Sequence, residues 1–150
     1  MTDTLFPTTV IGSLPRPAWL RDVILDRKAR KLSEKEAERL LDPAVETALN
    51  LQERAGLDKV TDGEWRRDSC VKVVAERVRG FEPDLIPIGD GLAYPAVVGP
   101  VEYHRPLVLD EIRFSRNRRR LKATLPAPYI IGATCGTRNT PGKPTPPASN

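Results

Sequence analysis

Three short apolar runs most constrain the fold that this chain can adopt. They are residues 8–11, 57–61 and 121–125, and each has the composition of a buried strand. Residues 18–28 carry apolar side chains at helical spacing, and further helical patterns follow before the second and third runs. Strands that alternate with helices typically build a parallel sheet. The sequence therefore predicts an α/β fold.

Local signals mark the ends of the longer helical stretch. Ser33 followed by Glu36 has the pattern of a capping box, which predicts a helix that begins at about residue 34. Asp42 and Pro43 have the pattern of an N-cap with proline in the first turn, so we expect a fresh helix to begin there. Gly56 is the expected C-cap.

The segment between the second and third runs is less regular. We expect a helix over 70–78, a loop over 80–91, extended hairpin-forming chain over 94–103 and a helix over 107–119. This part of the chain contributes no strand to the predicted parallel sheet.

Residues 133–150 differ in composition from the rest of the chain. They contain no large aliphatic or aromatic residue and no acid, but four prolines. Such a segment cannot build a core, so we expect it to be disordered. The predicted organisation is one folded domain over 1–132 and a tail over 133–150.

Composition excludes several classes of protein. The 150 residues suit one domain, and no run of 18 apolar residues could span a membrane. The first residues lack the basic and apolar regions of a secretory signal. Cys70 and Cys135 are the only cysteines, which is no disulfide framework and indicates a reducing, cytoplasmic setting.

The charge leaves two interpretations open. The formal charge is +4 and the sequence pI is about 9.3, which could indicate a nucleic-acid partner. Most basic residues are dispersed among acids, as on a solvated helix face, and one real cluster exists: Arg113, Arg116, Arg118, Arg119, Arg120 and Lys122. No set of aromatic residues for stacking on bases accompanies the cluster. We therefore favour a basic helix end over a phosphate-binding surface.

Two strand ends carry side chains suited to a binding site. At Ile11–Ser13, a glycine lets the backbone approach a ligand and a serine offers donors to a small carboxylate. Asp62 and Glu64 follow the second run, and a carboxylate there could bind a ligand ammonium or transfer a proton. Taken alone, the same residues are more often a simple turn, a loop-capping aspartate and a solvated glutamate.

Metal and nucleotide motifs are weak in this sequence. Zinc sites take three or four ligands, and His104, Cys70 and Cys135 show no such spacing. No phosphate-binding loop or dinucleotide-binding glycine motif occurs.

Three segments together resemble one family. Residues 6–17 (FPTTVIGSLPRP), 52–64 (QERAGLDKVTDGE) and 121–129 (LKATLPAPY) are similar to the opening of the catalytic C-terminal barrel of cobalamin-independent methionine synthases. The resemblance covers about residues 5–132. It implies a partial TIM (β/α)8 barrel, with roughly its first three strands and their helices.

The resemblance also implies an activity and a site. In this family a methyl group passes from a methylated folate to homocysteine, whose sulfur a zinc ion binds as thiolate. Ile11 and Ser13 would hold the amino-acid portion of homocysteine, Glu64 would pair with its ammonium, and Asp62 is a weaker candidate for the same pocket. Relatives on this scaffold use other thiols such as coenzyme M. A small basic binding protein is the alternative from another class.

Two departures from the family pattern lead to a further expectation. The family's zinc ligands (a His, two Cys and a Glu) lie on later strands and have no match here, and neither do its folate contacts near residues 89–95. A shifted reading frame over 132–149 can encode a peptide, Arg-Asp-Leu-Trp and onward, that resembles the family's continuation. We therefore expect a frameshifted fragment, which alone performs no methyl transfer.

Overall fold

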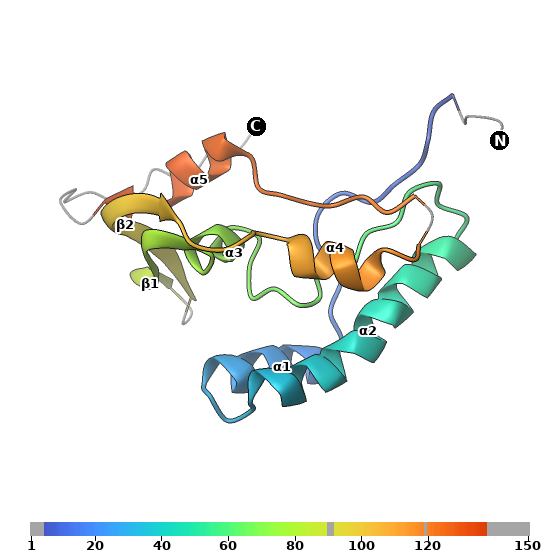
Figure 1. Cartoon of the computed structure of the whole chain (residues 1–150), viewed down its shortest axis with the longest axis horizontal. Coiled ribbons are helices and arrows are strands. Elements are labelled where there is room, and N and C mark those ends of the chain that lie inside the picture. The colour runs from blue at the N-terminus through green and yellow to red at the C-terminus, as the bar shows by residue number, and fades with distance from the viewer. Residues whose placement is uncertain (1–4, 90–91, 119, 138–150) are drawn as a thin grey trace. The chain divides into compact units, whose positions relative to one another are not determined.

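The computed structural model describes residues 5–89, 92–118 and 120–137 (Figure 1). They fall into two compact units. One unit holds the residues up to Asp68 together with Val108–Thr124, and the other holds Ser69–Leu107 and the residues from Leu125 onward. Both predicted site segments belong to the first unit.

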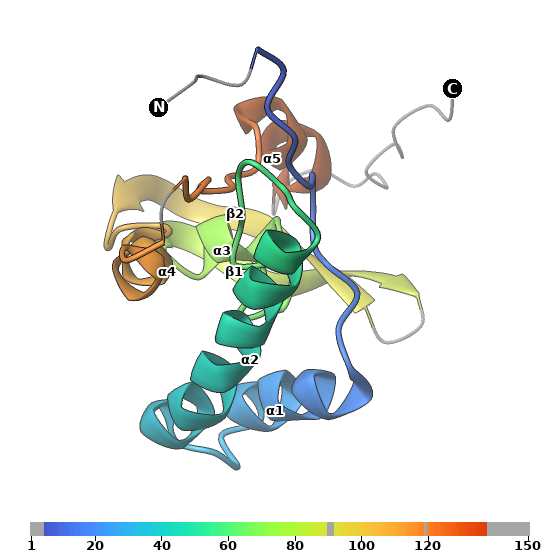
Figure 2. The ribbon, with the colours of Figure 1, turned by 90° about the vertical axis from the view of Figure 1, so that its right-hand side faces the viewer.

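Two helices, α1 (Ala18–Lys28) and α2 (Glu34–Arg54), lie side by side in the first unit (Figures 1 and 2). The predicted capping box is confirmed: the Glu36 N–H donates to the Ser33 hydroxyl, and the Ser33 N–H donates to the Glu36 carboxylate at 2.9 Å. Two hydrogen bonds lower the pKa of Glu36: the larger effect comes from the Ser33 hydroxyl and the smaller from the Ser33 N–H. The C-cap is Ala55 rather than the predicted Gly56, which follows it with φ of 79° in the left-handed conformation common after helix ends.

The predicted restart of the helix at Asp42 is wrong, because α2 continues through Pro43. The Asp42 carboxylate does not cap a helix but pairs with Arg66 Nη2 at 2.6 Å. Leu41, Ala44 and Val45 are buried on both sides of the proline. Packing of this continuous apolar face outweighs the backbone hydrogen bond that proline cannot make.

The three predicted strands lie parallel but meet only at single bridges. Thr9 pairs with Lys59, and Val60 pairs with Leu121. The expected order and direction are confirmed at these positions, whereas the expected full-length strands are not formed. Asp58 explains part of the difference, because its carboxylate accepts hydrogen bonds from the N–H and the hydroxyl of Thr8, both at 2.9 Å. The Thr8 N–H is thus bound by a side chain, whereas the Thr8 carbonyl still accepts from the Lys59 N–H at 3.0 Å.

The core of the first unit lies between the two helices and the second parallel segment. Its members are apolar and almost fully buried: Leu20, Ile24, Ala37, Leu41, Ala44, Val45, Ala48, Leu49, Val60 and Trp65. Most of them come from one face of α2. Helix α2 therefore supports the loop that begins after Val60, where the acidic candidates lie.

The second unit is built on an antiparallel hairpin of β1 (Val78–Gly89) and β2 (Leu92–Tyr103). Strand β3 (Gly136–Thr137) adds to β2 in parallel, and helices α3 (Lys72–Ala75) and α5 (Pro128–Thr134) complete the unit. The hairpin-forming character of 94–103 is confirmed.

Two expectations for this region are wrong. Most of the predicted loop over 80–91 belongs to β1, and the predicted helix over 70–78 is reduced to the single turn of α3. The strand tolerates its glycines and prolines because its register with β2 shifts in three places. The predicted helix over 107–119 is present as the shorter α4 (Leu109–Ser115), which belongs to the first unit.

The predicted tail begins inside a helix. Ala133 and Thr134 form the last turn of α5, and Gly136–Thr137 is β3. Residues 138–150 lie outside the described residues, so the expectation of a disordered tail is not tested there. Among the helices that the structure describes, none combines the length and apolar character needed to cross a membrane.

Two neighbouring leucines of α2 test how the first unit is stabilised. Leu41 is fully buried, whereas 45% of Leu40 is exposed. We expect Leu41→Ala to lower the free energy of unfolding by about 2–5 kcal/mol, because the substitution leaves a cavity in the core. Leu40→Ala is the control and should cost less than about 1 kcal/mol. Urea denaturation followed by circular dichroism measures both, and equal losses would contradict the described core.

Candidate functional site

The two predicted site segments are held together by the main chain. The Leu14 N–H donates to the Gly63 carbonyl at 3.1 Å, and the Trp65 indole N–H donates to the Leu14 carbonyl at 3.2 Å. The Trp65 ring is buried in the core. The corner at residues 11–13 therefore lies against the loop at 62–65, although about 50 residues separate them in sequence.

Ser13 and Glu64 are in direct contact. The Ser13 hydroxyl donates to Glu64 Oε2 at 2.7 Å. Only 4% of Glu64 is exposed, and its φ of 57° lies in the left-handed region. A residue other than glycine rarely adopts this conformation unless its surroundings hold it there.

Neighbouring side chains supply that support. The Glu64 N–H donates to Asp62 Oδ1 at 3.0 Å, and the Glu64 carbonyl accepts from Arg16 Nη2 at 2.8 Å. Both main-chain polar groups of Glu64 are thus satisfied. Its carboxylate remains the group that can act on a ligand.

The other two candidates have different surroundings. Ile11 is 94% exposed and precedes Gly12, whose φ is 77°. Asp62 is buried, and its Oδ2 has no hydrogen-bond partner among the described residues. Asp62 therefore combines a structural contact to the Glu64 N–H with one free acceptor.

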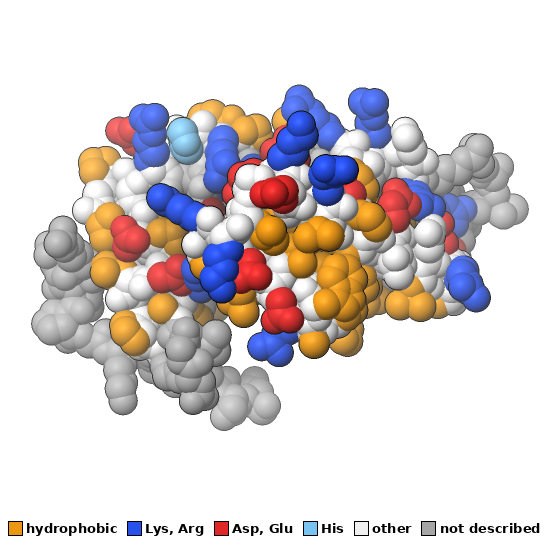
Figure 3. Space-filling model, turned by 90° about the horizontal axis from the view of Figure 1, so that it is seen from below, with side chains coloured by type: hydrophobic (Ala, Val, Ile, Leu, Met, Phe, Trp, Pro, Cys, Tyr) orange, Lys and Arg blue, Asp and Glu red, His pale blue; other side chains and the backbone are white. Residues whose placement is uncertain are grey.

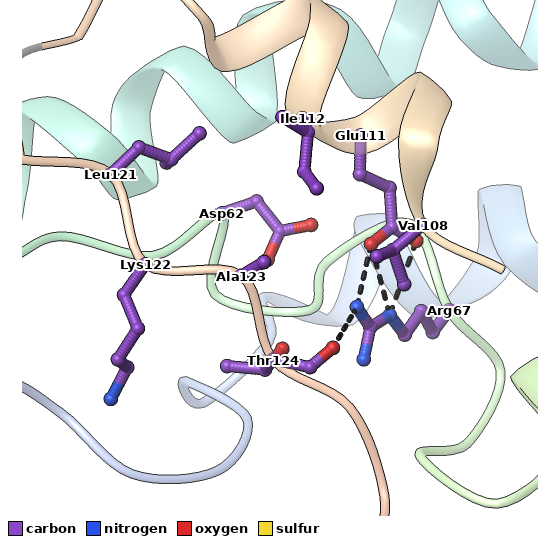
Figure 4. A pocket seen from close by; sticks show the side chains of 9 residues that line it. All are labelled: Asp62, Arg67, Val108, Glu111, Ile112, Leu121, Lys122, Ala123 and Thr124. Atoms are coloured by element: carbon purple, nitrogen blue, oxygen red, sulfur yellow. Dashed lines mark hydrogen bonds and ion pairs between the residues drawn. The ribbon is translucent and has the colours of Figure 1, made fainter.

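The free oxygen of Asp62 belongs to a small pocket within the first unit (Figure 4). The pocket has apolar and charged walls, formed by Asp62, Arg67, Val108, Glu111, Ile112, Leu121, Lys122, Ala123 and Thr124. Figure 4 shows the Asp62 carboxylate between the third parallel segment and α4, and Arg67 beside Glu111. Lys122 extends away from Arg67, and its ammonium donates to the Val10 carbonyl.

Arg67 is the residue that sequence reasoning missed. Its Nε lies 3.1 Å from Glu111 Oε1, and its Nη2 lies 2.6 Å from Glu111 Oε2 and 2.9 Å from the Thr124 carbonyl oxygen. Burial alone lowers the pKa of Arg67, but the hydrogen bond to Glu111 and the charges of Glu111, Asp62 and Glu64 outweigh it, so the pKa is raised. The arginine three residues after Glu64 was the available signal, but nothing local in the sequence points to Glu111.

Residues 6–123 match the model of the catalytic domain of the cobalamin-independent synthases. The chain belongs to the cobalamin-independent methionine synthase family. The matched range includes both site segments, Arg67 and Glu111.

Two archaeal relatives agree with this membership. The methionine synthase of Sulfurisphaera tokodaii is 43% identical over 133 residues, and that of Sulfolobus acidocaldarius is 40% identical over 134 residues. Each match covers 85% of this chain, but only 39% and 40% of the respective relative. The chain thus spans about two fifths of the length of these methionine synthases.

Solved structures show the same relationship. The B12-independent methionine synthase of Shewanella sp. W3-18-1, in complex with selenomethionine, matches with a TM-score of 0.74 at 27% identity. That match covers 93% of this chain and 43% of the Shewanella chain. A putative B12-independent methionine synthase from Listeria monocytogenes matches with a TM-score of 0.65 at 20% identity, which supports the fold alone.

The described residues do not fit the zinc ion that the methionine synthase family implies. Within residues 5–89, 92–118 and 120–137, no three His, Cys, Asp or Glu side chains gather as a metal site requires. His104 is exposed, as is Cys70, and Cys135 is partly buried.

Three described members of the basic cluster, Arg113, Arg118 and Arg120, pair with acids. Arg118 binds both Glu46 and Glu53, and Arg120 lies 3.2 Å from Asp58 Oδ1. Basic and acidic side chains are interspersed on the face in Figure 3. Among the described members of the cluster, these pairs neutralise cations that a phosphate-binding surface would leave free.

The two cysteines provide a test of the local structure. Burial raises the pKa of the Cys135 thiol, and a hydrogen bond with Thr134 only partly opposes this effect. A raised pKa leaves less thiolate at neutral pH, so Cys135 should react more slowly than exposed Cys70 and accelerate above pH 9. Iodoacetamide labelling of the single-thiol variants C70S and C135S measures both rates. Equal rates at pH 7.5 would contradict the described surroundings of Cys135.

Proposed function

We propose that this chain binds the amino-acid end of a thiol substrate of the homocysteine type, at Ser13 and Glu64. The observation that carries the proposal is the hydrogen bond between these two side chains. It places a buried carboxylate next to the turn at Gly12. The structural relative from Shewanella, in complex with selenomethionine, supports a ligand of this class.

In this proposal the Glu64 carboxylate recognises the ligand ammonium. Glu64 Oε2 already accepts from Ser13, whereas Oε1 accepts no hydrogen bond from the described residues. An ammonium can therefore donate to Oε1 in a charge-assisted hydrogen bond. The low exposure of Glu64 strengthens the attraction, because water screens a buried charge less.

The corner at residues 11–13 is proposed to hold the ligand carboxylate. Main-chain N–H groups at this tight turn are suitable donors for such a group, whereas the Ser13 hydroxyl already donates its one hydrogen to Glu64. Ile11 contributes its main chain in this arrangement, since its side chain is exposed. Asp62 supports the site because its carboxylate accepts a hydrogen bond from the Glu64 N–H and so holds the Glu64 main chain.

We further propose that the first unit is the opening part of a TIM barrel. The two parallel bridges set three segments side by side in chain order. Ser13 and Glu64 each follow one of these segments, and Thr124 lies near the end of the third. In TIM barrels the ends of the parallel strands carry the site. The complete reaction, in which a methyl group passes from a methylated folate to a zinc-bound thiol, is proposed for the full-length relatives.

Replacement of Glu64 tests the proposed ammonium contact. We expect wild-type protein to bind L-homocysteine and L-methionine more tightly than 4-(methylthio)butanoate, which lacks the ammonium. Glu64→Gln should weaken the two amino acids about 10- to 150-fold, the range of a charged hydrogen bond worth about 1.5–3 kcal/mol. It should leave the deamino analogue nearly unchanged. Isothermal titration calorimetry at pH 7 measures all three ligands.

Glu38→Gln is the matched control, because Glu38 lies exposed on α2. It should change no affinity. Equal affinities of wild-type protein for methionine and its deamino analogue would contradict the proposed site. Preference for coenzyme M over homocysteine would favour a transferase for another thiol, and salt-dependent binding of nucleic acid without amino-acid binding would favour a basic binding protein.

A further inference from the structure

Arg67 has an unusual combination of contacts for a buried cation. Only 4% of it is exposed, and its Nε and Nη2 are engaged by Glu111 and the Thr124 carbonyl. Its remaining nitrogen, Nη1, has no hydrogen-bond partner among the described residues. Nη1 lies 3.7 Å from Glu64 Oε1.

This distance decides how Arg67 acts on Glu64. At 3.7 Å the two groups attract each other, but the contact is longer than a hydrogen bond. Oε1 therefore keeps its capacity to accept a hydrogen bond from a ligand. The Glu111 carboxylate and the Thr124 carbonyl bind the guanidinium on its Nε and Nη2 side (Figure 4). These contacts keep Nη1 at 3.7 Å from Oε1, so the positive charge stays close without a hydrogen bond.

We propose that Arg67 is a positioning residue, held by Glu111 and the Thr124 carbonyl, that orients the Glu64 carboxylate and leaves its Oε1 open toward a ligand ammonium. This inference rests on the proposed function, since it deepens the same site. Arg67 itself touches no ligand in this arrangement. It links the loop after the second parallel segment to α4 and to the end of the third parallel segment.

The charges around Glu64 give the proposal a pH signature. Asp62 lies on the same loop, Glu111 lies on α4, Arg16 binds the Glu64 carbonyl, and Lys122 lines the adjoining pocket. Removing the Arg67 charge leaves Glu64 near two other carboxylates. Neighbouring like charges favour the protonated form, which cannot bind an ammonium as an anion.

The experiment compares Arg67→Met with Arg66→Met in the full chain. Arg66 is an adjacent arginine that pairs with Asp42 and lies 4.4 Å from the centre of the Phe114 ring, so its loss disturbs packing without touching Glu64. L-methionine and 4-(methylthio)butanoate are titrated against each variant from pH 4.5 to 8. Circular dichroism and thermal unfolding identify the conditions in which each variant is folded.

We expect wild type and R66M to share one preference for methionine and one pH profile. R67M should lose at least about tenfold of that preference at pH 7, and its methionine affinity should decline at a higher pH than that of wild type. Arg67→Lys is measured as well, because it keeps the charge without the planar fork. It should restore the wild-type pH profile while binding methionine more weakly, and it replaces R67M if that variant does not fold.

The outcomes separate this inference from the proposed function. If wild type shows no preference for methionine over its deamino analogue, the proposed function fails and the inference fails with it. If wild type shows the preference and R67M retains it with an unchanged pH profile, only the positioning role of Arg67 is overturned. That role is overturned as well if R66M loses the preference as strongly as R67M, or if R67K has lost the wild-type pH profile.

Discussion

The buried pair of Arg67 and Glu111 is the interaction on which the first unit most depends. It joins the loop after the second parallel segment to α4, and the same guanidinium reaches the main chain at Thr124. Breaking a buried pair by removing one partner typically costs about 3–5 kcal/mol, because the other charge is left without compensation. A bidentate contact also fixes the orientation of both groups. The pair thus determines where α4 and the third parallel segment lie relative to Glu64.

Local chemistry explains which features the sequence could predict. The capping box at Ser33 and the glycine at position 56, which directly follows the C-cap Ala55, are local signals, so both can be recognised from the sequence alone. The relation of Ser13 to Glu64 could be anticipated because each follows an apolar run, and ends of parallel strands meet at one edge of a sheet. The membership of the family rested on the same segments, and it is confirmed by the match over residues 6–123.

Long-range packing explains what the sequence could not predict. Pro43 has every local feature of a helix start, yet it lies inside α2 because its neighbours are buried on one continuous face. The prolines and glycines of β1 indicate a loop, yet pairing with β2 makes them part of a strand with shifted register. Arg67 and Glu111 are 44 residues apart, and each alone looks like an ordinary surface charge. Only the fold brings them together.

The left-handed backbone of Glu64 has a consequence for how such a site can change over time. A residue other than glycine in this conformation costs about 1–3 kcal/mol, and β-branched side chains are the least tolerated there. Asparagine, aspartate and glycine fit the backbone more easily than glutamate does. Substitutions at this position are therefore most easily tolerated when they introduce asparagine, aspartate or glycine. These residues relieve the backbone strain, but their side chains are shorter or carry no charge. A lineage that keeps glutamate here retains a costly backbone in return for a long, charged side chain.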